Sequence, residues 1–206
     1  MADIYLASRS PRRRELLHQI GVRFETLLLR MEPRRPPDVD ETQRASESAE
    51  DYVERIAREK AMAGQRVLQA RTQLFRPVLA ADTVVVADGQ VLGKPESREQ
   101  AAAFLRRLSG RTHEVRTAVA LVVAPGPNLD PLVATSVSLV TMRAISSDEI
   151  ERYCGSNEPM DKAGAYAIQG KAAIFVERLE GSYSGVVGLP LAETASLLMR
   201  AGIRVL

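Results

Sequence analysis

The densest group of side chains suited to phosphate binding lies near the N-terminus, where Ser8 and Ser10 precede Arg12, Arg13 and Arg14. Each guanidinium can donate two parallel hydrogen bonds to a phosphate. An arginine run is also typical of a solvated basic helix face, and the run by itself does not distinguish the two. What favours an anion site is the position of these cations at one end of a predicted helix rather than along its side.

The residues around the arginines predict that helix and the strand before it. Residues 4–7 form an apolar run that is typical of a buried strand. Ser10 is a suitable N-cap, Pro11 suits the first helical position, and Gly21 ends the pattern. Free backbone N–H groups and the helix dipole attract anions at such a position. We therefore expect phosphate to bind at the start of this helix.

Asp82 is the candidate for a catalytic base. It lies in a strand predicted over residues 78–87, on the same face as Ala80, Val84 and Val86. Burying a carboxylate there without a partner costs free energy, which a metal ion or a lysine would offset. An aspartate that accepts hydrogen bonds from backbone N–H groups at a strand bend is the alternative interpretation.

Two lysines could bring further positive charge to a phosphate chain. Lys60 lies on a predicted helix, off its apolar stripe, and Lys94 follows Gly93. Residues 89–95 superficially resemble a phosphate-binding P-loop, but the segment is one residue short and has Pro95 where Ser or Thr is required. This difference excludes a Walker-type NTPase. Taken singly, each lysine is better explained as a solvated surface residue.

Composition limits the class of protein. The chain has 206 residues, of which 45% are hydrophobic and 26% charged, enough for a soluble globular protein with one domain or one two-lobed unit. A net charge of +2 is too small for general nucleic-acid binding. No apolar run approaches membrane-spanning length and no signal-peptide pattern is seen, so we expect a cytoplasmic protein without a membrane partner. Cys154 is the only cysteine, which excludes an internal disulfide.

The rest of the chain alternates predicted strands with predicted helices. Beyond those already named, strands are expected at 112–123, 132–142 and 172–179, and helices begin after Ser48, Ser97 and Ser146 and at Pro190. The helix after Ser48 is expected to end at Gly64, and Asp88-Gly89 predicts a tight hairpin. Hairpins among the helices predict an α/β fold whose mixed, twisted sheet is flanked by helices.

Two segments are predicted to form loops. Residues 30–40 are rich in proline and charge, which indicates an exposed loop. Residues 181–188 are rich in glycine and could close over a substrate, although the glycines can equally serve turns.

Five blocks of the sequence, in order, resemble the Maf family of nucleoside triphosphate pyrophosphatases. They are residues 6–17, 52–61, 81–86 with 93–95, 161–170 and 181–190. The resemblance implies one Maf-like domain over residues 1–206, elongated and able to divide into two lobes about a central cleft, with a fold similar to inosine triphosphate pyrophosphatases. It also implies a cytoplasmic, metal-dependent enzyme that cleaves nucleotides between the α- and β-phosphates.

The resemblance assigns roles to individual residues. Asp82 corresponds to the family's proposed general base and to a metal ligand. Glu41, preferred to Glu32 by its spacing to Tyr52, corresponds to an acidic position that helps to hold the metal, and a solvated loop acid is the alternative. Because the chain has no histidine cluster, oxygen ligands and Mg²⁺ or Mn²⁺ are favoured over zinc. The expected substrate contacts are Ser8, Arg12, Arg13, Lys60, Thr83, Lys94, Lys162 and Gln169.

The base is expected to be a pyrimidine. Thr83 and Gln169 offer neutral donors and acceptors for a pyrimidine edge, and Tyr166 offers a packing surface. Arg12, Thr83 and Gln169 match the family branch that acts on dTTP and UTP.

We therefore expect metal-assisted attack of water at the α-phosphorus of dTTP and UTP, giving the monophosphate and pyrophosphate. One alternative is the same chemistry on another or modified base, such as 7-methyl-GTP. The other is a non-catalytic regulator that binds nucleotides or nucleic acid, although no nucleic-acid partner is expected. A homodimer is implied by the family only.

Overall fold

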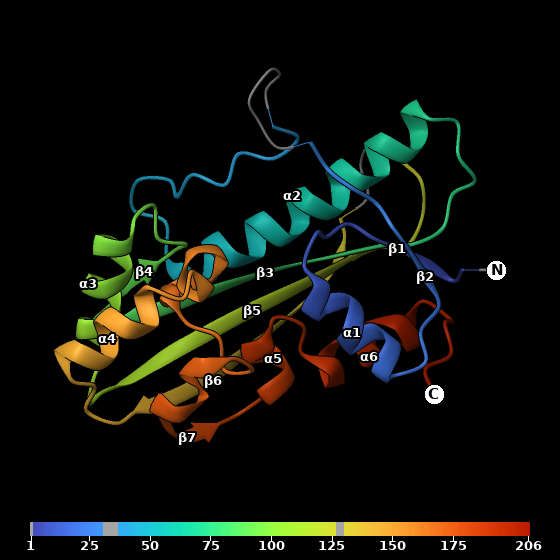
Figure 1. Ribbon diagram of the computed structural model, residues 1–206. Coiled ribbons are helices and arrows are strands. Elements are labelled where there is room, and N and C mark those ends of the chain that lie inside the picture. Colours follow the sequence, from blue (N-terminus) through green and yellow to red (C-terminus); the bar gives the residue numbers. More distant parts are fainter. Residues whose placement is uncertain (1, 31–36, 127–129) are drawn as a thin grey trace. The chain divides into compact units, whose positions relative to one another are not determined.

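The computed structural model describes residues 2–30, 37–126 and 130–206. Strands and helices are interspersed along the chain (Figure 1). The strands are β1 (Ile4–Leu6), β2 (Phe24–Thr26), β3 (Val78–Ala87), β4 (Gln90–Leu92), β5 (Thr112–Val122), β6 (Leu132–Met142) and β7 (Val176–Glu180). The helices are α1 (Pro11–Gln19), α2 (Ala49–Ala70), α3 (Arg98–Leu108), α4 (Ser147–Cys154), α5 (Tyr183–Val187) and α6 (Leu191–Arg200), with short 3-10 helices at Glu158–Asp161, Ala163–Ala165 and Lys171–Phe175.

The strands form a mixed sheet. Its order is β2-β1-β3-β5-β6-β7, and β4 pairs with β3 off this path. β1 pairs in parallel with β2 and β3, with Ile4 opposite Phe24 and Leu6 opposite Leu79. The pairs β3–β4 and β6–β7 are antiparallel. The expected α/β class with a mixed sheet is therefore confirmed.

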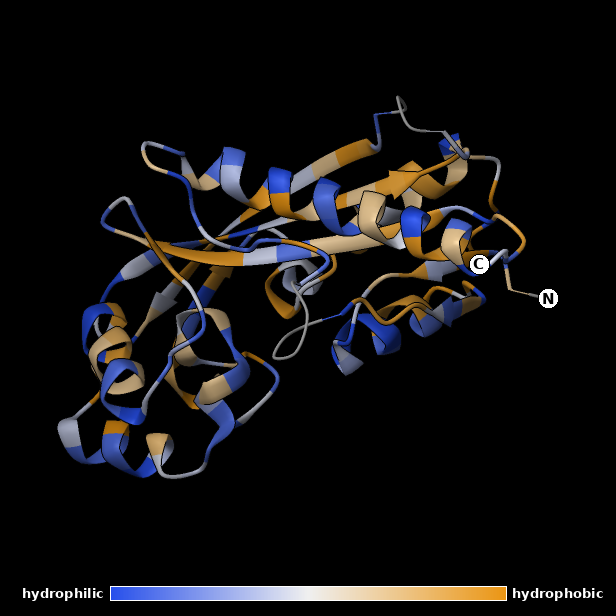
Figure 2. Ribbon diagram, turned by 90° about the horizontal axis from the view of Figure 1, so that it is seen from above, coloured by the Kyte–Doolittle hydropathy of each residue, from blue (hydrophilic) through white to orange (hydrophobic). Residues whose placement is uncertain are grey.

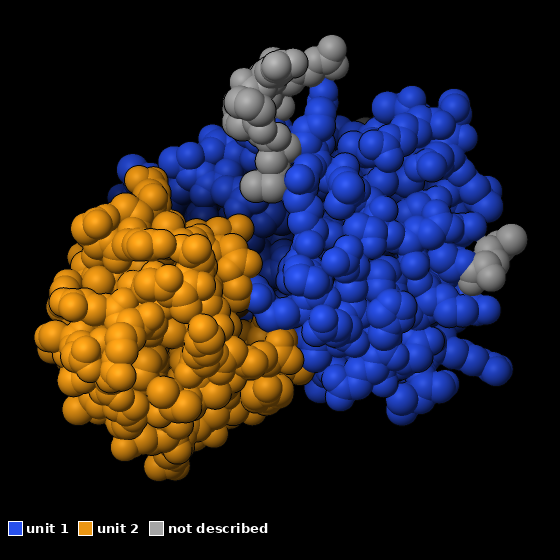
Figure 3. All heavy atoms as spheres, in the orientation of Figure 1, with its two compact units in different colours: residues 1–82, 117–135, 188–206 blue, residues 83–116, 136–187 orange. Residues whose placement is uncertain are grey.

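The chain divides into two compact units, coloured separately in Figure 3. Unit 1 consists of residues 1–82, 117–135 and 188–206, and unit 2 of residues 83–116 and 136–187. The boundary passes between Asp82 and Thr83 within β3, and β5 and β6 also contribute residues to both units. Neighbouring residues of one strand therefore belong to different units.

In unit 1 the predicted start of α1 is confirmed. The Ser10 hydroxyl accepts a hydrogen bond from the Arg13 backbone N–H, Pro11 occupies the first turn, and Gly21 has a φ of +72° just beyond the helix. Such a φ favours glycine because it lacks a Cβ. The N-cap and the glycine that follows the helix fix where α1 begins and ends, and so place the arginines at its first turn.

The predicted end of the next helix at Gly64 is wrong, since α2 continues to Ala70. Gly64 serves packing instead of ending the helix. A Cβ on this residue would lie 2.7 Å from Val78 Cγ1 and 3.2 Å from the Cβ of Ala7, so the helix backbone approaches the strands closely. Leu68, one turn later, is buried and continues the apolar face. In Figure 2, hydrophobic and hydrophilic residues alternate along α2, as expected for an amphipathic helix.

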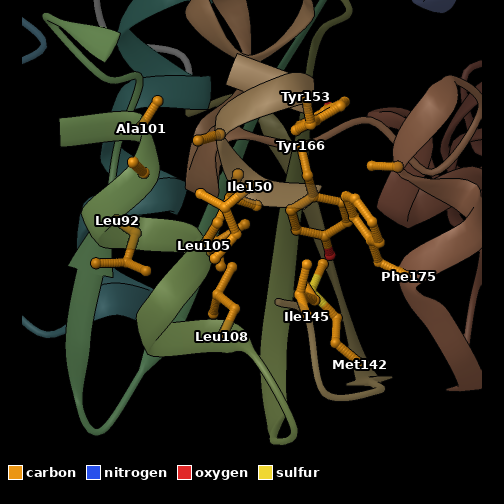
Figure 4. Packing of buried hydrophobic residues seen from close by; sticks show 14 of the residues in the cluster. Leu92, Ala101, Leu105, Leu108, Met142, Ile145, Ile150, Tyr153, Tyr166 and Phe175 are labelled. Carbon is orange, nitrogen blue, oxygen red and sulfur yellow. The ribbon is translucent and has the colours of Figure 1, made fainter. Parts of the chain in front are cut away.

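In unit 2 the predicted hairpin is confirmed, because Asp88 and Gly89 both have positive φ (48° and 72°) between the paired strands β3 and β4. Helices α3 and α4 bury one face each in an apolar cluster (Figure 4). Tyr166 is 6% exposed and belongs to this cluster. The expectation that its ring packs against a base is therefore wrong.

Two other predicted segments differ from the structure. Residues 172–179 were expected as one strand, but a 3-10 helix occupies Lys171–Phe175 before β7, because Ala172 and Phe175, three residues apart, are both buried on one side of it. The segment 181–188 contains α5, whose first turn is held by a bond from the Gly185 N–H to the Ser182 hydroxyl.

The loop expected at residues 30–40 lies partly outside the described residues. In the described part of this loop, Arg30 forms an ion pair with Asp38. Within the described ranges, no helix is both long enough and apolar enough to cross a membrane.

Candidate active site

A group of three charged side chains in unit 1 contains the predicted base. The Lys60 ammonium donates to Asp82 Oδ1 at 2.8 Å and lies 3.0 Å from Glu41 Oε1. The side chains of Lys60 and Asp82 are 15% and 13% exposed, whereas Glu41 is 41% exposed. Because charges this poorly solvated need partners, the lysine provides the compensation that a carboxylate on an apolar strand requires.

The secondary structure explains why these three residues meet. Asp82 lies within β3, and Lys60 lies on α2, which approaches β3 closely at Gly64. Lys60 is one helical turn before Gly64 on the same face. Glu41 comes from the loop that precedes α2. The predicted group of Lys60, Asp82 and Glu41 is therefore brought together, and Glu32, the alternative to Glu41, lies outside the described residues.

Arg13 at the start of α1 lies next to this group. Its Nη1 donates to the carbonyl of Ala81 at 2.6 Å, one residue before Asp82, and its Nε donates to the carbonyl of Gly188 at 2.7 Å. Burial lowers the pKa of Arg13, and the negative charge of Asp82 opposes this shift. Arg13 thus joins α1 to β3 and to Gly188, just before α6. A contact of Arg13 with a substrate would be additional to these bonds.

The other predicted residues at the start of α1 lie beside Arg13. The Ser8 hydroxyl accepts hydrogen bonds from the Ser10 backbone N–H at 3.2 Å and from Arg13 Nη1 at 3.5 Å. Arg12 is partly buried in the same turn. The structure thus places Ser8, Arg12 and Arg13 in unit 1 with the charged group of Lys60, Asp82 and Glu41.

The remaining predicted residues belong to unit 2. Lys94 is exposed. Gly93, the residue before it, accepts a hydrogen bond at its carbonyl from the N–H of Gly164. The residues around Lys94 therefore contact the segment that carries Lys162 and Gln169. Lys162 forms an ion pair with Asp161. Gln169 is exposed at the end of this segment, and Thr83 follows Asp82 on β3. Exposure leaves the Gln169 amide accessible to a ligand.

The segment that ends at Gln169 contributes one member of a buried polar pair. His113 Nε2 and the Tyr166 hydroxyl are 2.8 Å apart, and both side chains are buried. Burial lowers the pKa of His113 to about 4, which keeps the imidazole neutral at ordinary pH. This contact joins β5 to the segment that ends at Gln169.

Two residues on α2 that sequence reasoning did not select hold the Glu41 loop. Tyr52 donates from its hydroxyl to the Glu41 backbone carbonyl at 2.8 Å. Burial raises the pKa of Tyr52 to about 12, and the negative charges of Asp82 and Glu41 add to the shift. Arg55 donates to Glu47 and to the carbonyl of Thr42. Both lie in the sequence block 52–61, so their inclusion in that block was the available signal.

The donors present fit a hard divalent cation only in part. Two carboxylate oxygens, on Glu41 and Asp82, lie close enough to contact one ammonium, and Mg²⁺ is commonly held by one or two carboxylates plus substrate phosphates. In the ranges that the structure describes, no group of three or more His, Cys, Asp or Glu side chains could hold a metal alone. A cation bound here would therefore need further oxygen ligands, which a triphosphate can supply.

The comparisons with known proteins identify the family. The Maf-like protein family matches residues 3–201, and the chain belongs to this family. The chain is 54% identical to a dTTP/UTP pyrophosphatase of Aromatoleum aromaticum over 98% of its own length and 96% of the relative's. It is 50% identical to a protein of the same name from Dechloromonas aromatica, over 98% of each chain.

A solved structure, that of the Staphylococcus aureus Ham1 protein, is also similar. It has a TM-score of 0.40 and 14% sequence identity, covering 68% of this chain and 71% of that one.

Proposed function

We propose that this protein hydrolyses dTTP and UTP to the nucleoside monophosphate and pyrophosphate. The observation that carries the proposal is the contact of Lys60 with both Asp82 and Glu41, next to the first turn of α1, in a member of the Maf family. Cations, a carboxylate base and carboxylate ligands are the groups that phosphoanhydride hydrolysis requires. Relatives with at least 50% identity over nearly the full chain bear the name dTTP/UTP pyrophosphatase.

In the proposed mechanism Asp82 accepts a proton from the water that attacks the α-phosphorus. Pyrophosphate leaves as the bond between the α-phosphorus and the bridging oxygen breaks. Lys60 holds Asp82 in place, and its ammonium can also neutralise charge on the phosphate oxygens. Ser8, Arg12, Arg13, Lys94 and Lys162 are proposed to bind the substrate's phosphates.

A divalent cation, Mg²⁺ or Mn²⁺, is proposed as the cofactor. Asp82 and Glu41 would hold it, and it would neutralise negative charge on the phosphate chain. Lys60 contacts both of these carboxylates, at 3.0 and 2.8 Å.

Thr83 and Gln169 are proposed to select the base. A side-chain amide can pair with the adjacent donor and acceptor of a uracil or thymine edge. Cytosine presents the donor and acceptor in the reverse order at that edge, so an amide held in one orientation would leave them unpaired.

We propose that residues 1–206 act as one nucleotide-hydrolysing domain, that the protein is cytoplasmic, and that nucleic acid is not a partner. A homodimer is the proposed assembly, by analogy with the family.

A screen of nucleoside triphosphates with chromatography of the products tests the function. We expect dTTP and UTP to give the monophosphate and pyrophosphate, at rates well above those for CTP and 7-methyl-GTP and only with Mg²⁺ or Mn²⁺ present. Nucleoside diphosphate with orthophosphate as the first products would exclude this chemistry. Binding without product would favour a non-catalytic regulator, and a preference for 7-methyl-GTP would move the protein to another branch of the family.

A further inference from the structure

The loop before α2 is fastened to that helix at three consecutive backbone carbonyls. Tyr52 donates from its hydroxyl to the carbonyl of Glu41 at 2.8 Å. Arg55 donates from Nη2 to the carbonyl of Thr42 at 3.0 Å and from Nη1 to the carbonyl of Asp40 at 3.4 Å. The carbonyls of Glu41 and of both its chain neighbours are therefore bound by side chains of α2.

Arg55 also binds the far end of the same loop. Its Nε and Nη2 donate to the two carboxylate oxygens of Glu47, at 2.6 and 2.9 Å. The side chains of Arg55 and Glu47 are only 12% and 9% exposed, so this bidentate pair is shielded from water. The bond to Arg55 lowers the pKa of Glu47 to about 2, which keeps the carboxylate ionised under ordinary conditions. Two parallel hydrogen bonds and low exposure fix the relative orientation of the two groups more firmly than in an isolated surface ion pair.

Glu47 in turn holds the loop's own backbone. Its Oε2 accepts a hydrogen bond from the Arg44 N–H at 3.0 Å. Arg55, five residues before Lys60 on α2, thus connects both ends of the loop to the helix that carries the lysine facing Glu41. Lysine could not replace this arrangement, because an ammonium lacks the planar fork that reaches several acceptors at fixed angles.

We propose that Arg55 is a positioning residue that fixes Glu41 beside Lys60 and Asp82 through the backbone of residues 40–47. Arg55 contacts neither Lys60 nor Asp82 in the bonds described, and it acts through the carbonyls that flank Glu41 and through Glu47. The effect of this positioning on catalysis rests on the proposed function. The positioning itself is a property of the free protein.

Hydrogen exchange of the loop tests the positioning without any assay of activity. The variant R55K should speed amide exchange in a peptide covering residues 40–47 by about tenfold, while peptides from β3 and from the second half of α2 keep their rates. R44K is the matched control, since Arg44 lies in the same loop but its exposed guanidinium pairs only with Glu59 among the bonds described. It should exchange like the wild type. Unchanged exchange in R55K would overturn the proposal.

A double-mutant cycle with Glu41 tests the route of the effect. R55K should lower kcat/KM for dTTP about tenfold, within the range for partners that orient a ligand, and raise the Mg²⁺ concentration needed for half-maximal rate. In an E41Q background, R55K should lower kcat/KM only slightly further, because the carboxylate that Arg55 positions is already lost. Equal losses in both backgrounds would mean that Arg55 acts through general stability, and would overturn the proposal.

The two arms also separate this proposal from the proposed function. If the wild-type protein releases no pyrophosphate, or if E41Q is inactive, the exchange experiment alone decides the role of Arg55. Faster loop exchange in R55K with no wild-type activity would support the positioning and reject the function.

Discussion

Two groups of polar contacts, one in each unit, differ in charge. In unit 1 the partly buried groups are charged and paired: Lys60 contacts two carboxylates, and Arg55 holds Glu47. In unit 2 the buried pair of His113 and Tyr166 is neutral, and Tyr166 belongs to the apolar cluster. The charges in unit 1 can attract phosphate and exchange protons, whereas the lowered pKa of His113, about 4, leaves the pair in unit 2 without charge near pH 7. The proposed base and its charged partners thus lie in unit 1, and the contact of His113 with Tyr166 joins β5 to the Gln169 segment in unit 2.

Removing the charge of Asp82 tests the role of the charged group in unit 1 most directly. The change D82N should lower turnover of dTTP by roughly 10²–10⁴-fold, the usual loss for a general base, with the protein still folded. Steady-state kinetics and a melting curve measure both. D130N is the control, because Asp130 is an exposed aspartate of the same unit. Near-normal turnover in D82N would remove Asp82 from the mechanism.

His113 should make the stability of the fold depend on pH. Its pKa is about 4 when folded and about 6.5 when unfolded, so below pH 6.5 the unfolded chain gains a proton that the folded one does not. This contribution to stability is complete above pH 6.5 and falls by up to about 3 kcal/mol as the pH approaches 4. The change H113Q, which cannot titrate, should flatten the curve. Urea unfolding of both proteins between pH 7 and 4.5 measures the difference, and parallel curves would contradict it.

Gln169 tests whether unit 2 also reads the base. The change Q169A should weaken hydrolysis of dTTP and UTP by about 1–3 kcal/mol in transition-state free energy, because a partner on the base is left unsatisfied. The effect on CTP should be smaller, so the preference should flatten. Comparison of kcat/KM for UTP and CTP decides this. A variant that keeps the full UTP to CTP ratio would leave Gln169 as a turn residue.

The smallest expected effect comes from the close approach of α2 to β3. The change G64A places a methyl group 2.7 Å from Val78 Cγ1, which costs about 1–3 kcal/mol, partly offset by about 1 kcal/mol of helix propensity. A net loss of about 1 kcal/mol is expected from urea unfolding. G93A is the control, since nothing lies within 4 Å of a Cβ at that position. A G64A protein as stable as the wild type would show that Val78 can shift.

Local signals along the sequence predicted most of the elements correctly. Ser10, Ser48, Ser97 and Ser146 each cap the helix that they were expected to begin, because an N-cap depends on a few adjacent residues. The Asp88-Gly89 turn and the bounds of β3 were also correct. Periodicity and turn chemistry require only neighbours in the sequence.

Errors occurred where distant contacts override local preference. Gly64 ends a helix by its local preference, but in the fold it lets α2 pack against Val78. Tyr166 resembles an accessible aromatic in a motif, yet its ring is buried and its hydroxyl meets His113, more than fifty residues away.

Contiguous residues were enough to predict the arginine-bearing helix start, the apolar strand that carries Asp82, and the resemblance to the Maf family. The folded chain was needed to show that Lys60 is the partner of Asp82, that Glu41 joins them, and that Arg55 binds both ends of the Glu41 loop. These contacts depend on the distance between a helix and a strand and on the path of a loop. Both are set by packing of residues far apart in the chain, which no local pattern encodes.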